Sequence, residues 1–335
     1  MGHRLLGVGL VVILALLVVI CGGLYLLILH MPGASFQSTP SPLDSREETL
    51  RDRLKGHVRV LAEDIGERHY WRPDAKHRAA DYIEQVFRDS GHEPQRQAVP
   101  TGDEVFHNIE VELQGRGDKD EILVIGAHYD TVRGSPGADD NASGVAVLME
   151  LARLLPKESP ERTIRLVAFA NEESPFFGTE AMGSLRYARE ARVADENIVG
   201  MLSLEMLGYF TDEPGSQRRP PVLEYVYPDT GDFLAFVGNV ASRSLVRETI
   251  GAFRKYAEVP SEGLAAPELI DDIRRSDHWA FWQQGYPGLM ITDTANFRNP
   301  HYHGPDDTYD TLDYDTMARI TAALAKAVAG MPAGR

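Results

Sequence analysis

One stretch of the sequence combines residue types that could hold a metal ion. His128 and Asp130 follow an apolar run, residues 122–127, that is typical of a buried strand. Residues two apart on an extended chain point to the same side, so the imidazole and the carboxylate can act together. Such a pair suits a divalent metal, with the aspartate orienting the ring. Asp139 and Asp140 precede a stretch with helical character, whose dipole favours a carboxylate at its start. The alternative is a strand, a loop and an ordinary helix cap.

Two adjacent glutamates stand at the end of another predicted strand. Glu172 and Glu173 close the apolar segment 163–170. Adjacent residues on an extended chain face opposite ways, so one glutamate can ligate metal while its neighbour meets substrate as a general acid or base. A surface glutamate pair is the simpler alternative. Their position favours function, because open α/β sheets hold ligands at the carboxyl ends of their strands.

A lone carboxylate and two histidines complete the set. Glu205 lies in an otherwise apolar run, and burying an unpaired charge is costly, so it should be metal-bound or part of a buried salt bridge. His301 and His303 lie together in a loop rich in polar residues. Another histidine, His278, follows a plausible helix cap and is expected either to support the ligands or to be structural, rather than to bind metal.

Composition excludes several classes of protein. The chain has 335 residues, 43% hydrophobic and 25% charged, which is enough for one sizeable core. Its formal net charge of −16 argues against nucleic acid as a partner. The single cysteine, Cys21, lies in the N-terminal apolar run, so the rest of the chain has neither a disulfide framework nor a cysteine nucleophile.

The N-terminal segment predicts a membrane anchor. Residues 5–29 are apolar and uncharged, and at about 1.5 Å per residue they exceed the ~30 Å hydrocarbon core. A cleaved signal peptide has a shorter apolar region that ends at small residues, and neither feature is present. We therefore expect an uncleaved single-pass signal-anchor over residues 1–30, with secretion after cleavage as the alternative. Arg4 precedes the span and the next basic residue, apart from histidine, is Arg46, which places the body outside the cytoplasm.

The remaining chain reads as a linker, residues 31–45, and one α/β domain, residues 46–335. Strands are expected at 95–99, 108–114, 122–127, 163–170, 198–204 and 288–292. Helices are expected at 45–64, 75–90, 142–155, 240–256 and 315–329. Strands that alternate with helices predict a three-layer α/β/α fold around a mixed, largely parallel sheet.

Taken together, these stretches resemble the family-28 metallopeptidases, the co-catalytic di-zinc aminopeptidases of the secreted bacterial type. The resemblance covers roughly residues 50–330. Its order is His-x-Asp, Gly-Ala-Asp-Asp-Asn-Ala-Ser-Gly, Glu-Glu, a carboxylate after a strand, and a final His four residues before Asp-Thr. In that family the bridging Asp lies three residues before the Ser of the Ser-Gly pair, which selects Asp140 over Asp139. The spacing to Asp-Thr likewise selects His303 over His301.

The resemblance implies two Zn²⁺ ions per chain. One ion would take His128, Asp140 and Glu205, and the other Asp140, Glu173 and His303. Glu172 falls at the position of the general base. The residues expected to support these ligands from behind are Asp130, Asp277, His278 and Asp307. The chain departs from the commoner pattern at Glu205, where many members have Asp.

The implied activity is removal of N-terminal residues from peptides with a free N-terminus. Two cations about 3.5–4 Å apart lower the pKa of a shared water towards ~7 and polarise the scissile carbonyl, while Glu172 passes the proton to the leaving amine. One alternative is a glutaminyl cyclase-like enzyme with a single zinc. Another is a carboxypeptidase or deacylase, which would favour basic residues near the site such as Arg274, Arg275 and Arg298. The third is a catalytically dead, membrane-tethered ectodomain, for which broken ligand positions are expected.

Overall fold

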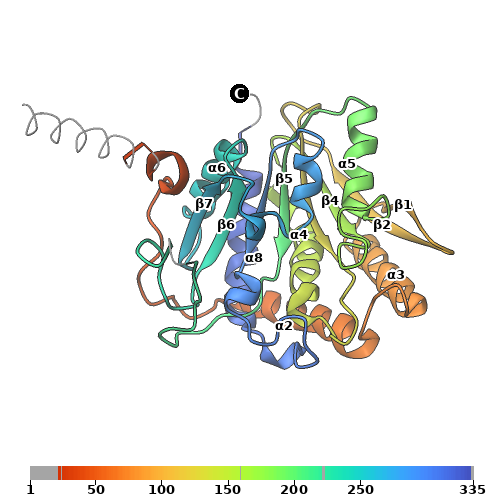
Figure 1. The fold of residues 1–335 in the computed structure, drawn as a ribbon, viewed down its shortest axis with the longest axis horizontal. Helices are drawn as coiled ribbons and strands as arrows, with labels where there is room; N and C mark the ends of the chain where they lie inside the picture. The colour runs from red at the N-terminus through yellow and green to blue at the C-terminus, as the bar shows by residue number, and fades with distance from the viewer. Residues whose placement is uncertain (1–21, 24, 159, 221–222, 333–335) are drawn as a thin grey trace, which may run out of the picture.

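One mixed sheet forms the centre of the molecule. The computed structural model describes residues 22–23, 25–158, 160–220 and 223–332, and its eight strands lie in the order β1-β2-β4-β3-β5-β8-β6-β7 (Figure 1). The strands are β1 (Gln95–Thr101), β2 (Glu104–Leu113), β3 (Ile122–His128), β4 (Thr163–Phe169), β5 (Ile198–Glu205), β6 (Leu234–Asn239), β7 (Ser261–Ala266) and β8 (Gly288–Thr292). The predicted strands are confirmed, and β6 and β7 are additions.

Parallel pairing is confined to the middle of the sheet and to one edge. The neighbours β4, β3, β5 and β8 run parallel, as do β6 and β7. The β1–β2 hairpin, the β2–β4 pair and the β8–β6 pair are antiparallel. The expectation of a mixed sheet is therefore confirmed, and the four central parallel strands β4, β3, β5 and β8 end together at one edge.

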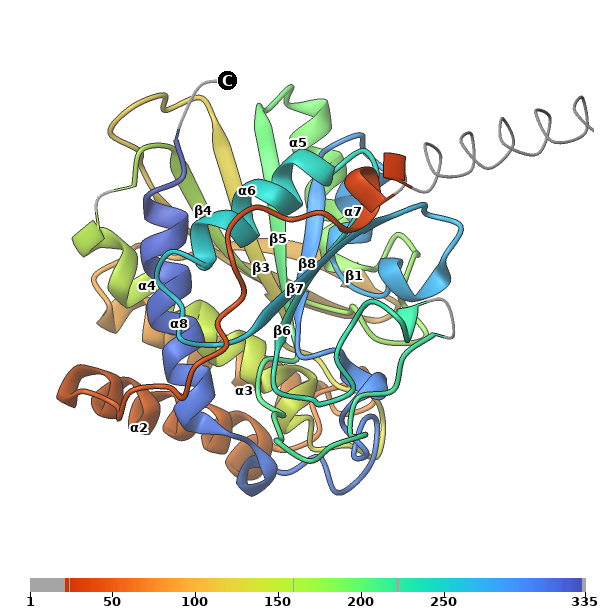
Figure 2. The ribbon, with the colours of Figure 1, turned by 90° about the vertical axis from the view of Figure 1, so that its left-hand side faces the viewer.

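Helices cover both faces of the sheet, so the predicted three layers are confirmed (Figure 2). The helices α2, α3, α4, α6 and α8 pack on one face around the larger apolar core, and α5 and α7 cover the other face. Their bounds are α2 (Ser45–Arg59), α3 (Pro73–Asp89), α4 (Gly144–Glu158), α5 (Gly183–Val193), α6 (Arg243–Phe253), α7 (His278–Trp282) and α8 (Tyr314–Ala329). Short helical segments lie at η1 (Tyr25–Leu29), η2 (Val60–Ile65), η3 (Ala138–Ser143), η5 (Asp271–Arg274), η6 (Ala295–Phe297) and η7 (Tyr309–Thr311).

The strand β3 shows why these residues form a central strand. All seven of its residues are buried, as expected of a strand covered on both faces. Leu123 and Ile125 point into the larger core, whereas Ile122 and Val124 point into the smaller one beside α5 and α7. Because the side-chain period of a strand is two, both cores need an apolar residue at every position, and the run stops only at His128.

The segment between the predicted anchor and the first long helix lies against the body. Met31 is buried in the larger core. The backbone carbonyls of Pro32 and Gly33 accept hydrogen bonds from Arg254, and the Ser35 hydroxyl accepts one from the Ser261 N–H. Figure 2 shows this segment, in red, passing across α6 and β7 on its way to α2.

Within the part of the chain that the structure describes, no helix has both the length and the apolar character required to cross a membrane. Most of the predicted span, residues 5–29, lies outside the described residues.

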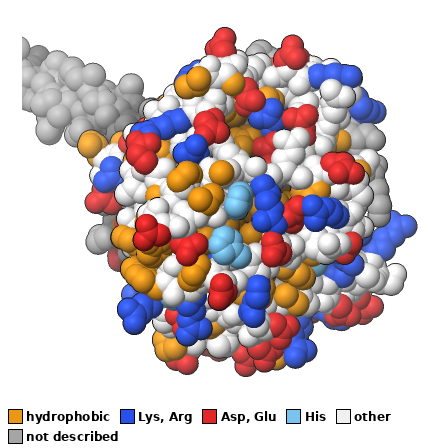
Figure 3. All heavy atoms as spheres, turned by 90° about the vertical axis from the view of Figure 1, so that its right-hand side faces the viewer, with side chains coloured by type: hydrophobic (Ala, Val, Ile, Leu, Met, Phe, Trp, Pro, Cys, Tyr) orange, Lys and Arg blue, Asp and Glu red, His pale blue; other side chains and the backbone are white. Residues whose placement is uncertain are grey.

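On the face shown in Figure 3, the acidic and basic side chains of the described residues are interspersed, so charge of one sign is not gathered into a single block there.

Candidate metal centre

Three neighbouring strands bring the first candidate ligands and the predicted base to one edge of the sheet. His128 is the last residue of β3 and Glu205 the last of β5. Glu172 and Glu173 follow β4, and β4, β3 and β5 are adjacent in the sheet. Their parallel direction places all four side chains at the carboxyl ends, where open α/β sheets bind ligands.

The loop between β3 and α4 supplies a further carboxylate. The Asp307 side chain accepts hydrogen bonds from the backbone N–H of Asp139 at 2.8 Å and of Asp140 at 3.1 Å, which fixes this segment. The carboxylate of Asp139 is occupied elsewhere, by the Gly208 N–H and the Asn299 side-chain amide. The Asp140 carboxylate instead faces both His128 and His303.

Two groups of three side chains share Asp140. His128 Nε2 lies 3.4 Å from Asp140 Oδ1 and 3.4 Å from Glu205 Oε2. His303 Nε2 lies 3.1 Å from Asp140 Oδ2 and 3.4 Å from Glu173 Oε1. Within each group the ligand atoms all lie within 4.8 Å of one another. The two oxygens of one carboxylate therefore serve two separate groups, as a bridging ligand does.

The spacing and the unmet polar atoms both fit metal ions. Ligand atoms about 2.0–2.2 Å from a tetrahedral zinc are roughly 3.3–3.6 Å apart, close to the distances of 3.1–3.4 Å found between the paired atoms. His128 Nε2 and Asp140 Oδ1 are buried without a hydrogen-bond partner among the residues that the structure describes. Buried polar atoms normally have a partner, so a cation is the natural occupant of the space between them.

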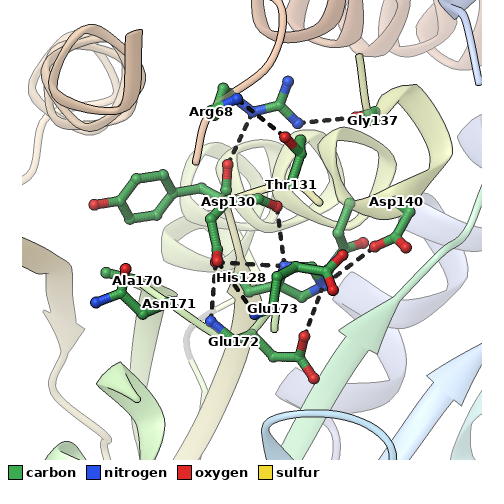
Figure 4. A network of polar contacts seen from close by, with 12 residues as sticks. Arg68, His128, Asp130, Thr131, Gly137, Asp140, Ala170, Asn171, Glu172 and Glu173 are labelled. Atoms are coloured by element: carbon green, nitrogen blue, oxygen red, sulfur yellow. Dashed lines mark hydrogen bonds and ion pairs between the residues drawn. The ribbon is translucent and has the colours of Figure 1, made fainter. Parts of the chain in front are cut away.

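Asp130 contacts His128 and the backbone of both glutamates (Figure 4). Its carboxylate accepts hydrogen bonds from the backbone N–H of Glu172 at 3.0 Å and of Glu173 at 3.2 Å. Its backbone carbonyl lies 3.2 Å from His128 Nδ1. A proton on Nδ1 leaves the Nε2 lone pair free for a metal. Asp130 therefore contacts one histidine and the backbone of both glutamates, and its contact with the glutamates was not predicted.

Glu205 is held by a hydroxyl group. The Ser276 hydroxyl donates to Glu205 Oε2 at 2.6 Å, and it also contacts the hydroxyl of Ser203. The backbone on either side of Glu205 is fixed by Asn141, whose amide donates to Leu204 O and accepts from the Met206 N–H. The glutamate is buried, and its side chain reaches the same group as His128. Its greater length compared with aspartate is therefore accommodated.

Burial and the crowding of carboxylates raise the pKa values of both glutamates, Glu172 and Glu173. Burial raises the pKa of Glu173 to about 7, and repulsion by Asp140 adds to this effect. Burial also raises the pKa of Glu172 well above its ordinary value, with attraction by His128 opposing the rise. Glu172 Oε2 lies 4.0 Å from His128 Nε2. Cations bound among these groups would supply the countercharge that protons otherwise provide.

A buried arginine, which sequence reasoning missed, shapes the loop that carries Asp140. The Arg68 guanidinium donates to the carbonyl of Gly137 (Figure 4). It also donates to the backbone carbonyls of Leu61, Gly66, Tyr129 and Pro136. Burial lowers its pKa to about 10, against attraction by Asp307. Hydrogen bonds from its three nitrogens to five backbone carbonyls make it the organising residue of this loop.

The other residues considered from the sequence, Asp277, His278 and His301, belong to neither ligand group. Asp277 is buried, and its pKa is raised to about 7 by burial, against the attraction of His128. The His278 ring lies 2.7 Å from the backbone carbonyl of Ile273 and packs on Trp282 rather than on a ligand, which fits the structural alternative to a role in supporting the ligands. His301 lies beside Tyr209, outside both groups of ligating atoms.

A pocket of about 150 Å³ opens onto the ligating groups. It is lined by Asp140, Glu172, Glu173, Ser174, Phe177, Glu205, Arg275, Tyr302 and His303. Of the three arginines considered from the sequence, only Arg275 reaches this lining. Arg274 pairs with Asp271, and Arg298 is buried against Gln217. The pocket is therefore strongly acidic, with one arginine at its wall.

Comparison with known proteins agrees with this geometry. Residues 108–328 match the family model described as peptidase family M28. The protein YfbL of Escherichia coli (strain K12) is 40% identical over 278 residues, which cover 80% of this chain and 84% of YfbL. A probable zinc metalloprotease of Pyrenophora teres f. teres is 28% identical over 64% of this chain and 49% of its own length. Leucine aminopeptidase 1 of Emericella nidulans is 27% identical over 73% of this chain and 62% of its own length.

Solved structures share the fold. The LapA aminopeptidase of Legionella pneumophila superposes with a TM-score of 0.66 at 19% identity, covering 89% of this chain and 79% of LapA. The glutaminyl cyclase of Tannerella forsythia gives a TM-score of 0.60 at 20% identity, covering 84% of this chain and 98% of the cyclase. The match to the family model spans more than half of the sequence, and YfbL is similar over most of both chains. The chain therefore belongs to peptidase family M28.

Proposed function

We propose that the chain is a zinc-dependent aminopeptidase that holds two ions. The observation that carries this proposal is the pair of ligand groups joined by one carboxylate: His128, Asp140 and Glu205 on one side, Asp140, Glu173 and His303 on the other. Each group offers one nitrogen and two carboxylates, a donor set that zinc accepts. The relatives named zinc metalloprotease and leucine aminopeptidase support the metal and the activity, whereas the number of ions rests on the two ligand groups.

The residues of the chain divide the work between binding and proton transfer. When bound, two divalent cations lower the pKa of a water molecule and polarise a carbonyl oxygen. Glu172 lines the pocket but belongs to neither ligand group, so its carboxylate is free to accept a proton from water and to donate it to the leaving amine. Its backbone is fixed by Asp130, which keeps the base in place during both transfers.

The acidic pocket favours a substrate that presents a positive group. Asp140, Glu172, Glu173 and Glu205 all line it, and the free α-amine of a peptide would lie among these carboxylates. An internal peptide bond has no such amine next to the scissile carbonyl. We therefore infer exopeptidase action on peptides with a free N-terminus.

A panel of aminoacyl-anilides, assayed with and without a strong chelator, tests the proposal. We expect hydrolysis that the chelator abolishes and that added zinc restores. Conversion of N-terminal glutamine peptides to the cyclic product, without anilide hydrolysis, would instead identify a glutaminyl cyclase. Hydrolysis only of peptides with a blocked N-terminus and a free carboxylate would assign a carboxypeptidase and give Arg275 a role in binding that carboxylate. Metal binding without any turnover would indicate an inactive ectodomain.

For the N-terminus, we propose a single-pass anchor over residues 5–29 with the body on the extracytoplasmic side. The support is the uncharged apolar sequence of this run. The packing of residues 31–41 along α6 and β7 would then hold the body close to the anchor's end, since Ser41 also contacts Glu258. Fractionation of cells that express the full chain tests this proposal. Soluble protein whose N-terminus lies beyond residue 29 would show a cleaved signal instead.

A further inference from the structure

A fully buried lysine lies behind the two glutamates, on a helix that the family model does not match. Lys76 belongs to α3, outside residues 108–328, and has no solvent exposure. Lysine is almost never fully buried unless it is paired, because removing its charge from water is costly. A methionine of similar length would fill the same space without that cost. The burial of this ammonium group therefore calls for a reason.

The contacts of the ammonium group identify its partners. It donates a hydrogen bond to the side-chain carbonyl of Asn171 and lies 3.9 Å from Asp130 Oδ2. The ring of Phe106 lies below it, with the centroid 4.2 Å away, and that of Tyr129 is 5.9 Å away. Burial lowers the pKa of Lys76 to about 8, against attraction by Asp130, so the group is still charged at neutral pH. One anion, one amide and two aromatic faces thus replace its water.

Both polar partners act on the backbone that carries the glutamates. Asn171 directly precedes them and has a φ of +60°, in the left-handed region where the chain turns out of β4. Its amide donates to the Thr101 hydroxyl and to Ala181 O, so its side chain is fixed on every side. Asp130 accepts the N–H groups of both Glu172 and Glu173. Lys76 is therefore bound to the residue before the pair and to the residue that holds the pair.

We propose that Lys76 is a positioning residue for the proposed reaction: its buried charge fixes the turn at Asn171 and the carboxylate of Asp130, and through them sets the places of Glu172 and Glu173. This inference rests on the proposed function for the roles of the two glutamates. Glu172 would then lose its alignment, and Glu173 its fit to the metal, when the charge is removed. The helix α3 would thus complete a site whose ligands all lie further along the chain.

Lys76→Met tests the proposal, because it keeps the length of the side chain and removes the charge. Replacing groups that orient metal ligands typically costs about 10–100-fold in metal affinity or activity, and we expect a loss of that size in kcat with KM changed less than about threefold. Competition with a chelator should show one of the two ions bound about tenfold more weakly. Lys76→Gln, which can still donate to Asn171, should fall between the wild type and Lys76→Met. The matched control is Lys55→Met, the same change at a lysine on α2 that lies over the Tyr314 ring.

Each outcome decides the matter. Lower kcat and weaker binding of one ion, in variants that unfold well above the assay temperature, support the positioning role. Wild-type kcat and metal affinity in Lys76→Met, with only the unfolding temperature changed, would make Lys76 a packing residue and overturn the proposal. Failure of both Lys76 variants to fold would overturn it in the same way. The wild-type arm reports separately on the proposed function: if it shows no peptidase activity, the metal-affinity comparison still tests Lys76.

Discussion

Glu205 offers the sharpest test of a single ligand, because its two possible roles predict opposite results. As a metal ligand it would complete the group of His128 and Asp140. As an ordinary salt-bridge partner it would only balance His128, whose Nε2 lies 3.4 Å away. Glu205→Ala removes the carboxylate in both cases. The other group, which contains Glu173 and His303, keeps all of its side chains.

The expected size of the effect follows from the number of ligands. Zinc sites with four protein ligands contribute about 10–16 kcal/mol, roughly 2.5–4 kcal/mol per ligand, so losing Glu205 should weaken one ion about 10²–10³-fold. Breaking a buried salt bridge instead costs about 3–5 kcal/mol of folding stability and leaves metal binding intact. Glu205→Gln separates the two roles further, since an amide oxygen can still accept from the Ser276 hydroxyl. Glu205→Asp should retain both ions at reduced affinity, because the ligand type is kept and only its reach is shortened.

Elemental analysis and thermal unfolding on the same preparation provide the assay. We expect close to one tightly bound zinc per chain in Glu205→Ala and in Glu205→Gln, and two in Glu205→Asp. The matched variant Glu268→Gln changes another glutamate that makes a polar contact, with Asn239, and should keep two. Two tightly bound ions in a destabilised Glu205→Ala protein would refute the assignment.

Three further predictions concern Glu172 as the base, Arg68 beside the loop that carries Asp140, and Glu150, which links α4 to His57 on α2. Glu172→Gln keeps the shape of the side chain but cannot accept a proton, so turnover should fall roughly 10²–10⁴-fold with both ions bound, and near-normal turnover would move the base elsewhere. Arg68→Met leaves several buried carbonyls without a donor and should lower the free energy of unfolding in urea by about 3 kcal/mol or more; a loss below about 1 kcal/mol would show that water replaces the arginine. Although burial raises the pKa of Glu150, hydrogen bonds from His57 and Arg153 lower it to about 2. A carboxylate whose pKa is depressed in the folded state stabilises the fold at pH values above its unfolded pKa. The free energy of unfolding of the wild type should therefore fall by about 3 kcal/mol between roughly pH 5 and pH 2, and that of Glu150→Gln should not. Parallel plots of unfolding free energy against pH for the two proteins would contradict this prediction.

Much of the central fold was predictable because its signal is apolar and continuous. The runs that become β3, β4, β5 and β8 are buried on both faces, so the sequence contains almost no polar interruption there. The edge strand β7, with the sequence Ser-Glu-Gly-Leu-Ala-Ala, has weak strand propensity and forms by pairing with β6. The position of β8 between β5 and β6 is also a tertiary result that no local pattern contains.

The ligating residues were predictable for a different reason. Each stands where an apolar run ends or beside a glycine-rich turn, and their order along the chain resembled that of a known family. The structure brings Asp140 and His303 into the ligand groups and leaves Asp139 and His301 out, in agreement with the spacing used to choose between them. Their service as zinc ligands stays a prediction until metal is measured.

The residues that hold the site from behind were not predictable. Lys76 lies in the sequence Asp-Ala-Lys-His-Arg, which is typical of the exposed face of a helix, and yet it is fully buried. Arg68 likewise stands in a polar stretch and gives no apolar or spacing signal. For His278, the sequence left open whether it supports the ligands or is structural. At the start of a helix, successive side chains point about 100° apart, and its ring turns to the Ile273 carbonyl.

The number of zinc ions per wild-type chain tests the central claim most directly. Native mass spectrometry and elemental analysis of the purified full chain, before and after dialysis against a strong chelator, give that number alongside the rate of anilide hydrolysis. We predict two ions per chain, loss of both ions and of hydrolysis on chelation, and recovery of both when zinc is returned. A wild-type chain that binds one ion or none, or that hydrolyses the anilides equally well after chelation, would contradict the account.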